Sequence, residues 1–155
     1  MSCIFCDISQ HNQKAHVIWE DKDHISFLSI FPNTVGVTVV IPKKHYSSYA
    51  FDQPEEVLFG LIGATKKTAL LLDKALPGVA RTGMVFEGYG VDHLHAKLFP
   101  MHCNGNNSEF KKISSNNKYF FAKYEGYLSS HDGSREKEET LEKQANLIRS
   151  YNTEL

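Results

Sequence analysis

The stretch VDHLHAKLFPMH, residues 91–102, decides how this sequence is interpreted. Within it His93, His95 and Lys97 recur at every second position, separated by apolar residues. A period of two is typical of a β-strand, because successive side chains of a strand point to opposite faces. We therefore predict a strand over residues 93–99 that carries two imidazoles and one ammonium on a single face.

This polar face is suited to phosphate chemistry. An imidazole can act as a nucleophile, a general base or a metal ligand. A neighbouring ammonium disfavours protonation of the imidazole and can itself hold a phosphate oxygen. The opposite face, with Leu94, Ala96 and Leu98, is apolar and is expected to meet a helix. The competing interpretation is a solvated strand face that carries two histidines by chance.

Upstream of this stretch the sequence predicts three further strands. AHVIWED (15–21) and HISFLSI (24–30) flank the turn signal Asp-Lys-Asp and predict a hairpin. VTVVIP (37–42) is rich in β-branched residues and predicts a buried strand. Pro42 should end its pairing, because proline has no N–H to donate.

A long helix is predicted between these strands and the histidine stretch, over about residues 54–76. Asp52 and Glu55 form a pattern like a capping box, and Gly78 is a stop signal. Apolar or small residues recur at three- and four-residue spacing, which predicts one face packed on a sheet. This stripe comprises Val57, Leu58, Leu61, Ile62, Thr65, Ala69, Leu72 and Leu76.

The remaining segments complete the expected order of elements. TGMVFEG (82–88) predicts a strand, followed by a glycine-rich bend, and Pro100 should end the strand that carries the histidines. CNGNNS (103–108) is typical of a loop. YFFAKYEGYL (119–128) is compatible with a further strand or a ligand-facing segment, and residues 135–150 predict a polar C-terminal helix.

This order predicts an α+β fold with a mostly antiparallel sheet, one long packed helix and a C-terminal helix. The 155 residues fit a single domain over 1–155, with a core of about 1–103 and an extension of about 104–155. The net charge of −1 and the lack of basic clusters argue against nucleic acid as a partner. We expect a cytoplasmic protein without a membrane segment, because no signal peptide or long apolar run is visible.

The three cysteines include the pair Cys3-x-x-Cys6 near the N-terminus. Two thiolates at this spacing supply half of a tetrahedral zinc site, and the other half must come from distant histidines: His45, His93 or His102. A redox role requires a thioredoxin-like strand before the motif, and the sequence shows none. The remaining alternative is that both cysteines act as small apolar residues in the core.

Three motifs in this order resemble the histidine triad superfamily: CIFC (3–6), VVIPKKH (39–45) and VDHLHAKLFP (91–100). The resemblance runs from Cys3 to about Pro100. It implies an α+β fold, homodimers whose sheets join, nucleotide binding and cleavage at the α-phosphate.

The resemblance also implies roles for individual residues. The middle histidine of the triad, which attacks phosphorus in the family, is His95. Members with the CxxC element hold zinc through four positions, which in this chain are Cys3, Cys6, His45 and His93. Positions that line the nucleoside pocket in the family are occupied by Ile4, Phe5, Phe27 and Ile30, although each could equally be an ordinary apolar packing residue.

The sequence departs from the family pattern at several substrate contacts. Lys97 stands in place of the third histidine, and Val37 in place of a histidine in the strand before VIP. Ser29 replaces the aspartate that usually holds the ribose, and Tyr89-Gly90 replaces the usual Gln-Ser before the triad. Ser29 offers the weaker ribose contact, whereas Lys97 can take over a phosphate contact.

The sequence thus predicts a nucleotide hydrolase or transferase. Neutral His95 would attack the α-phosphorus of a nucleoside phosphoramidate or dinucleoside polyphosphate, and water would hydrolyse the covalent intermediate. Lys97 and backbone N–H groups would offset charge on the phosphoryl oxygens. The alternatives are a nucleotide-binding sensory protein with little turnover and a zinc-stabilised interaction module without a ligand.

Overall fold

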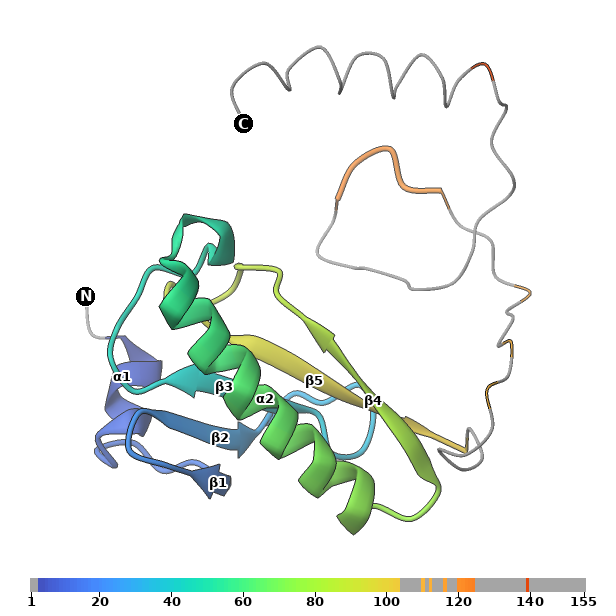
Figure 1. Ribbon diagram of the computed structural model, residues 1–155, viewed down its shortest axis with the longest axis horizontal. Helices are drawn as coiled ribbons and strands as arrows, with labels where there is room; N and C mark the ends of the chain where they lie inside the picture. Colours follow the sequence, from blue (N-terminus) through green and yellow to red (C-terminus); the bar gives the residue numbers. More distant parts are fainter. Residues whose placement is uncertain are drawn as a thin grey trace. The chain divides into compact units, whose positions relative to one another are not determined.

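The computed structural model describes residues 3–103, 110, 112, 116, 120–124 and 139. The chain divides into two units, Met1–Glu109 and Phe110–Leu155 (Figure 1). In chain order the helices and strands of the first unit are α1 (Ile4–Ser9), β1 (Val17–Glu20), β2 (His24–Leu28), β3 (Thr38–Pro42), the 3-10 helix η1 (Ala50–Asp52), α2 (Glu55–Ala75), β4 (Val79–Val85) and β5 (Ala96–His102).

The strands form one antiparallel sheet in the order β1-β2-β3-β5-β4. The predicted hairpin is β1–β2, and its turn is held by Asp21, whose carboxylate accepts hydrogen bonds from the backbone N–H groups of Asp23 and His24. β3 ends at Pro42, as expected. The structure confirms the α+β class and the mostly antiparallel sheet.

Successive side chains of each strand point to opposite faces of the sheet, and both faces carry a cluster of packed apolar residues. On one face lies α2, which crosses the sheet in Figure 1. Its apolar stripe meets Leu94 and Leu98, as the sequence predicted. On the other face α1 packs against β2 and β3. The side chains packed together there are Phe5, Ile8, Ile25, Phe27, Val39 and Ile41. The segment that holds the histidines is therefore fixed against a packed core.

The predicted strand over 93–99 is displaced by three residues, because β5 begins only at Ala96. His93 and His95 lie in the loop that enters the strand. The loop backbone is committed elsewhere: the N–H of Leu94 donates to Tyr46 O at 2.8 Å, and the N–H of Ser48 donates to Asp92 at 2.9 Å. These contacts with the segment after β3 replace strand pairing at His93 and His95, so both histidines are held by a loop rather than by the sheet.

Two other boundaries also differ from the prediction. Pro100 does not end β5, which continues to His102 and pairs Pro100 with Thr82 of β4. β4 itself begins directly after Gly78 and ends at Val85, earlier than the predicted strand over 82–88. The chain reverses at Gly78, where φ is +76°, so pairing starts at once.

The start of α2 is not a capping box. Pro54 is the N-cap residue and no side chain caps the helix, while Asp52 belongs to η1. The apolar stripe is also rotated slightly from the predicted one. Ile62 is 42% exposed, whereas Ala64 and Thr68, which the prediction omitted, are buried.

Predictions for the C-terminal third fall mostly outside the described residues. This holds for the loop 103–108 beyond Cys103, and for the helix 135–150 apart from Glu139, which is helical. Residues 120–124 are described and form no strand. The extent of the core and of the C-terminal extension stays a prediction. Among the described residues, no helix is long and apolar enough to cross a bilayer.

Candidate active site and metal centre

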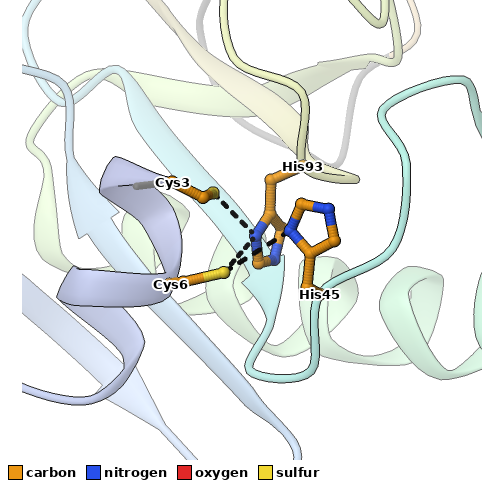
Figure 2. Close-up of side chains that lie close together, drawn as sticks. All are labelled: Cys3, Cys6, His45 and His93. Atoms are coloured by element: carbon orange, nitrogen blue, oxygen red, sulfur yellow. Dashed lines mark hydrogen bonds between the residues drawn. The ribbon is translucent and has the colours of Figure 1, made fainter. Parts of the chain in front are cut away.

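Four side chains from three parts of the chain converge at one end of the sheet (Figure 2). The short helix α1, which was not predicted from the sequence, presents Cys3 at its N-cap and Cys6 one turn later. His45 follows β3, and His93 precedes β5. One potential ligand atom from each of the four lies within 4.8 Å of all the others.

The spacing of these atoms fits a tetrahedral zinc ion. The Sγ atoms of Cys3 and Cys6 lie 3.4 and 3.5 Å from Nδ1 of His93, and Cys6 Sγ lies 3.4 Å from Nδ1 of His45. Ordinary zinc–sulfur and zinc–nitrogen bond lengths place such a sulfur and nitrogen about 3.6 Å apart across a tetrahedron. His102, the remaining alternative ligand from the sequence, contacts the Val35 carbonyl instead.

The protonation of His93 also suits a ligand. Its Nε2–H donates to the Pro42 carbonyl at 2.8 Å, so Nδ1 carries the lone pair and faces the cysteines. Burial lowers the pKa of His93 and keeps the ring neutral at pH 7. Burial raises the pKa of the Cys6 thiol, so thiolate formation there depends on a cation such as zinc.

His95 is held in a single neutral tautomer. Its ring is 2% exposed, and Nδ1–H donates to the His93 carbonyl at 2.7 Å, which leaves the lone pair on Nε2. Burial has the largest effect on the pKa of His95 and lowers it; the nearby Lys97 lowers it further, while Glu87 acts in the opposite direction. A neutral imidazole with a fixed, unprotonated Nε2 has the properties of a nucleophile.

Lys97 is paired with an acidic side chain. Its ammonium donates to the carboxylate of Glu87, which lies two residues beyond the end of β4. The lysine side chain is 32% exposed and that of Glu87 is 17% exposed. Glu87 was missed because an acid ten residues before a lysine carries no signal until the strand register is known.

The residues expected to line a nucleoside pocket fall into two groups. Phe5 lies edge-on against the ring of His95, with ring centroids 5.5 Å apart, and also against the buried Phe27. Ile4, Ile30 and Tyr89 are exposed at 43%, 72% and 65%. The structure therefore brings Phe5 to His95 and leaves these three side chains on the surface.

Ser29 and Val37, which replace polar residues of the family pattern, each have a local structural role. The hydroxyl of Ser29 accepts a hydrogen bond from the N–H of Phe31 at 3.1 Å, so it stabilises its own loop. Val37 is 5% exposed and packs as an ordinary apolar residue. The positions that would hold ribose or phosphate polar contacts in the family thus serve the packing and turn geometry of this chain.

The model of the HIT domain matches residues 10–103, more than half of the chain. The chain belongs to the HIT domain family. Family members bind nucleotides and include hydrolases.

Three relatives illustrate this membership. A HIT-like protein from Methanocaldococcus jannaschii is 37% identical over 102 residues, covering 63% of this chain and 78% of the relative. The adenosine 5′-monophosphoramidase hnt1 of Schizosaccharomyces pombe is 27% identical over 100 residues, which cover 64% of this chain and 74% of the relative. The crystal structure of a zinc-bound histidine triad family protein from Mycobacterium smegmatis is 28% identical, with a TM-score of 0.62, and covers 74% of this chain and 85% of the other.

Proposed function

We propose that this HIT protein is a hydrolase that cleaves nucleoside phosphoramidates or dinucleoside polyphosphates at the α-phosphorus. The observation that carries the proposal is the fixed tautomer of His95, whose Nε2 lone pair is available because Nδ1–H is bound to the His93 carbonyl. Buried, neutral imidazoles with one nitrogen held in this way are pre-organised for nucleophilic attack.

The reaction proceeds in two steps. Nε2 of His95 attacks the α-phosphorus, a phosphorus–nitrogen bond forms, and the bond to the leaving group breaks: an amine departs with a proton taken from solvent, and a polyphosphate departs as its anion. Water then attacks the nucleotidyl-His95, releases the nucleoside monophosphate and restores the neutral imidazole. The ammonium of Lys97 offsets the negative charge on the phosphoryl oxygens in both steps. Two easier steps replace one difficult displacement.

The comparisons support the class of reaction. A relative bears the name adenosine 5′-monophosphoramidase, and a HIT family hydrolase from Legionella pneumophila shares the fold. The family match supplies nucleotide binding, and the geometry of His95 supplies the attacking group.

Mass spectrometry after brief incubation with adenosine 5′-phosphoramidate or diadenosine tetraphosphate tests the mechanism. The wild-type chain should gain the mass of one adenylyl group on the peptide containing His95. His95→Ala should abolish both adduct and turnover, whereas His95→Asn should still bind nucleotide because its shape is similar. His16→Ala, which changes an exposed histidine outside the site, should match the wild type. Equal turnover by wild type and His95→Ala would end the enzymatic interpretation.

We propose in addition that Cys3, Cys6, His45 and His93 hold one zinc ion. Four protein ligands leave no open position, so the ion would stabilise the fold rather than act on substrate. Bound zinc would anchor α1, and with it Phe5, beside the loop that holds His95. Free cysteines at a zinc site persist most readily where thiols are kept reduced, so we also propose a cytoplasmic location.

A second candidate is a nucleotide-binding sensory protein with little turnover. The observation that favours it is the use of Ser29 for a loop contact and of Val37 for packing, which removes two substrate contacts of the family pattern. The two candidates differ in one measurement. His95→Ala leaves the function of a sensor nearly intact, because binding rather than attack is its task.

A further inference from the structure

Lys97 and Glu87 form an ion pair on the same side of the sheet as the proposed nucleophile. Leu98, the neighbour of Lys97 in β5, packs toward α2, so Lys97 faces the α1 side. Val39, its partner in β3, belongs to the cluster on that side. Phe5, which packs on this cluster, touches the ring of His95. The pair and the nucleophile therefore share one environment.

The position of the ammonium depends on Glu87. The backbone of Lys97 is fixed between β3 and β4, where it pairs with Val39 and Val85. Its long side chain has four rotatable bonds, and the contact that the structure shows for its ammonium is the Glu87 carboxylate. Because Glu87 is only 17% exposed, it holds the ammonium in one place more firmly than a solvated acid would.

The pair also sets the net charge beside the nucleophile. A phosphoryl oxygen that approaches Lys97 is attracted by the ammonium and repelled by the carboxylate behind it. One negative charge in direct contact with Lys97 gains more than it loses, because it is nearer to the ammonium. Additional charges farther along a polyphosphate feel a nearly neutral pair and gain little from it.

We propose that Glu87 is a positioning residue for Lys97, and that the pair favours substrates with few negative charges in total, such as nucleoside phosphoramidates, over the more highly charged nucleoside polyphosphates. This inference rests on the proposed attack by His95 and narrows its substrate class. Glu87 does not touch the substrate; it acts through the ammonium that it holds.

The test compares Glu87→Gln with Glu87→Asp and with Glu20→Gln. Glu20 is the matched control, because it pairs with Lys43 at 2.6 Å elsewhere in the sheet. For each variant, calorimetry gives the Kd of AMP and of ATP, and steady-state kinetics gives kcat and KM for adenosine 5′-phosphoramidate and diadenosine tetraphosphate. Thermal melting verifies that each variant is folded.

Glu87→Gln should favour ATP over AMP by about three- to tenfold relative to wild type, because it removes one repelling charge near the phosphate chain. Its kcat for the phosphoramidate should fall about tenfold, since the ammonium is no longer held in place. Glu87→Asp should restore most of kcat, and Glu20→Gln should behave as wild type. If Glu87→Gln does not fold, Lys97→Met, which removes the attracting ammonium and keeps the repelling carboxylate, should shift binding the other way, toward AMP.

Unchanged ATP-to-AMP ratios in Glu87→Gln, or in Lys97→Met where only that variant folds, would overturn the inference. The same holds if Glu87→Gln still lowers kcat when Lys97 is already methionine, because the acid would then not act through the lysine. A wild-type chain that binds nucleotides but forms no adduct contradicts the proposed hydrolysis alone, because the binding ratios remain measurable. A chain that binds neither nucleotide overturns both.

Discussion

At the scale of single residues, the site depends on which ring nitrogen of each histidine donates a hydrogen bond to a backbone carbonyl. The carbonyl of Pro42 accepts a hydrogen bond from Nε2–H of His93, and the carbonyl of His93 accepts one from Nδ1–H of His95. Each ring therefore presents its other nitrogen: Nδ1 of His93 toward the cysteines and Nε2 of His95 as the proposed nucleophile. One imidazole thus serves the proposed metal centre and the next serves the proposed chemistry.

The zinc proposal predicts that replacing Cys3 lowers the zinc content of the protein, whereas replacing Cys103 does not. Protein purified without added zinc should contain about one zinc per chain, and Cys3→Ser should lose most of it, because a neutral hydroxyl is a poor replacement for a thiolate. Metal analysis measures the content, and thermal melting should show a lower Tm for the zinc-free protein. Cys103→Ser removes an exposed cysteine outside the cluster and should keep full occupancy. Full zinc content in Cys3→Ser would refute this ligand set.

At the scale of elements, the sequence predicted what depends on local pattern. The β1–β2 hairpin, β3 and α2 all follow from periodicity and turn residues, and each was found within a few residues of its prediction. The start of β5 was wrong because it depends on long-range contacts from Tyr46 and Ser48, which leave no mark in the local sequence. The ion pair of Glu87 with Lys97 was not predicted for the same reason, since it forms only when β4 and β5 are aligned.

The turn of the β1–β2 hairpin yields a pH-dependent prediction. Partial burial alone would raise the pKa of Asp21, but the N–H groups of Asp23 and His24 outweigh it, and the pKa is lowered. The folded state thus favours the carboxylate, so its stabilisation is present above the usual pKa of aspartate and is lost as the pH falls through the lowered value.

Asp21→Ala should therefore cost about 1 kcal/mol of unfolding free energy at pH 7 and much less near pH 2, where wild-type Asp21 is protonated. Denaturant unfolding of both proteins at the two pH values measures this difference. Asp23→Ala, in the same turn, should have little effect, because only the backbone of Asp23 takes part in these hydrogen bonds. A cost for Asp21→Ala that is equal at both pH values would show that the charge is irrelevant.

At the scale of the whole molecule, the sheet of the first unit has two edges, β1 and β4, of which β4 adjoins an apolar surface. Met84 of β4 is 45% exposed, and α2 exposes Phe59, Ile62 and Leu70 along one stripe. Asp73, on the same side of α2, accepts a hydrogen bond from Thr82 of β4, so this stripe leans toward β4. Apolar surface beside an open strand edge is suited to a second copy of the chain.

We propose a homodimer formed through β4 and this stripe of α2. Light scattering at micromolar concentration should give about twice the chain mass of 17.6 kDa. Ile62→Lys should shift the protein toward the monomer, because it places an ammonium in the apolar contact. Val17→Lys is the matched control: Val17 is 40% exposed, close to the 42% of Ile62, but lies on β1 at the other edge. A wild-type monomer would contradict the dimer, and equal dissociation by both variants would place the interface elsewhere.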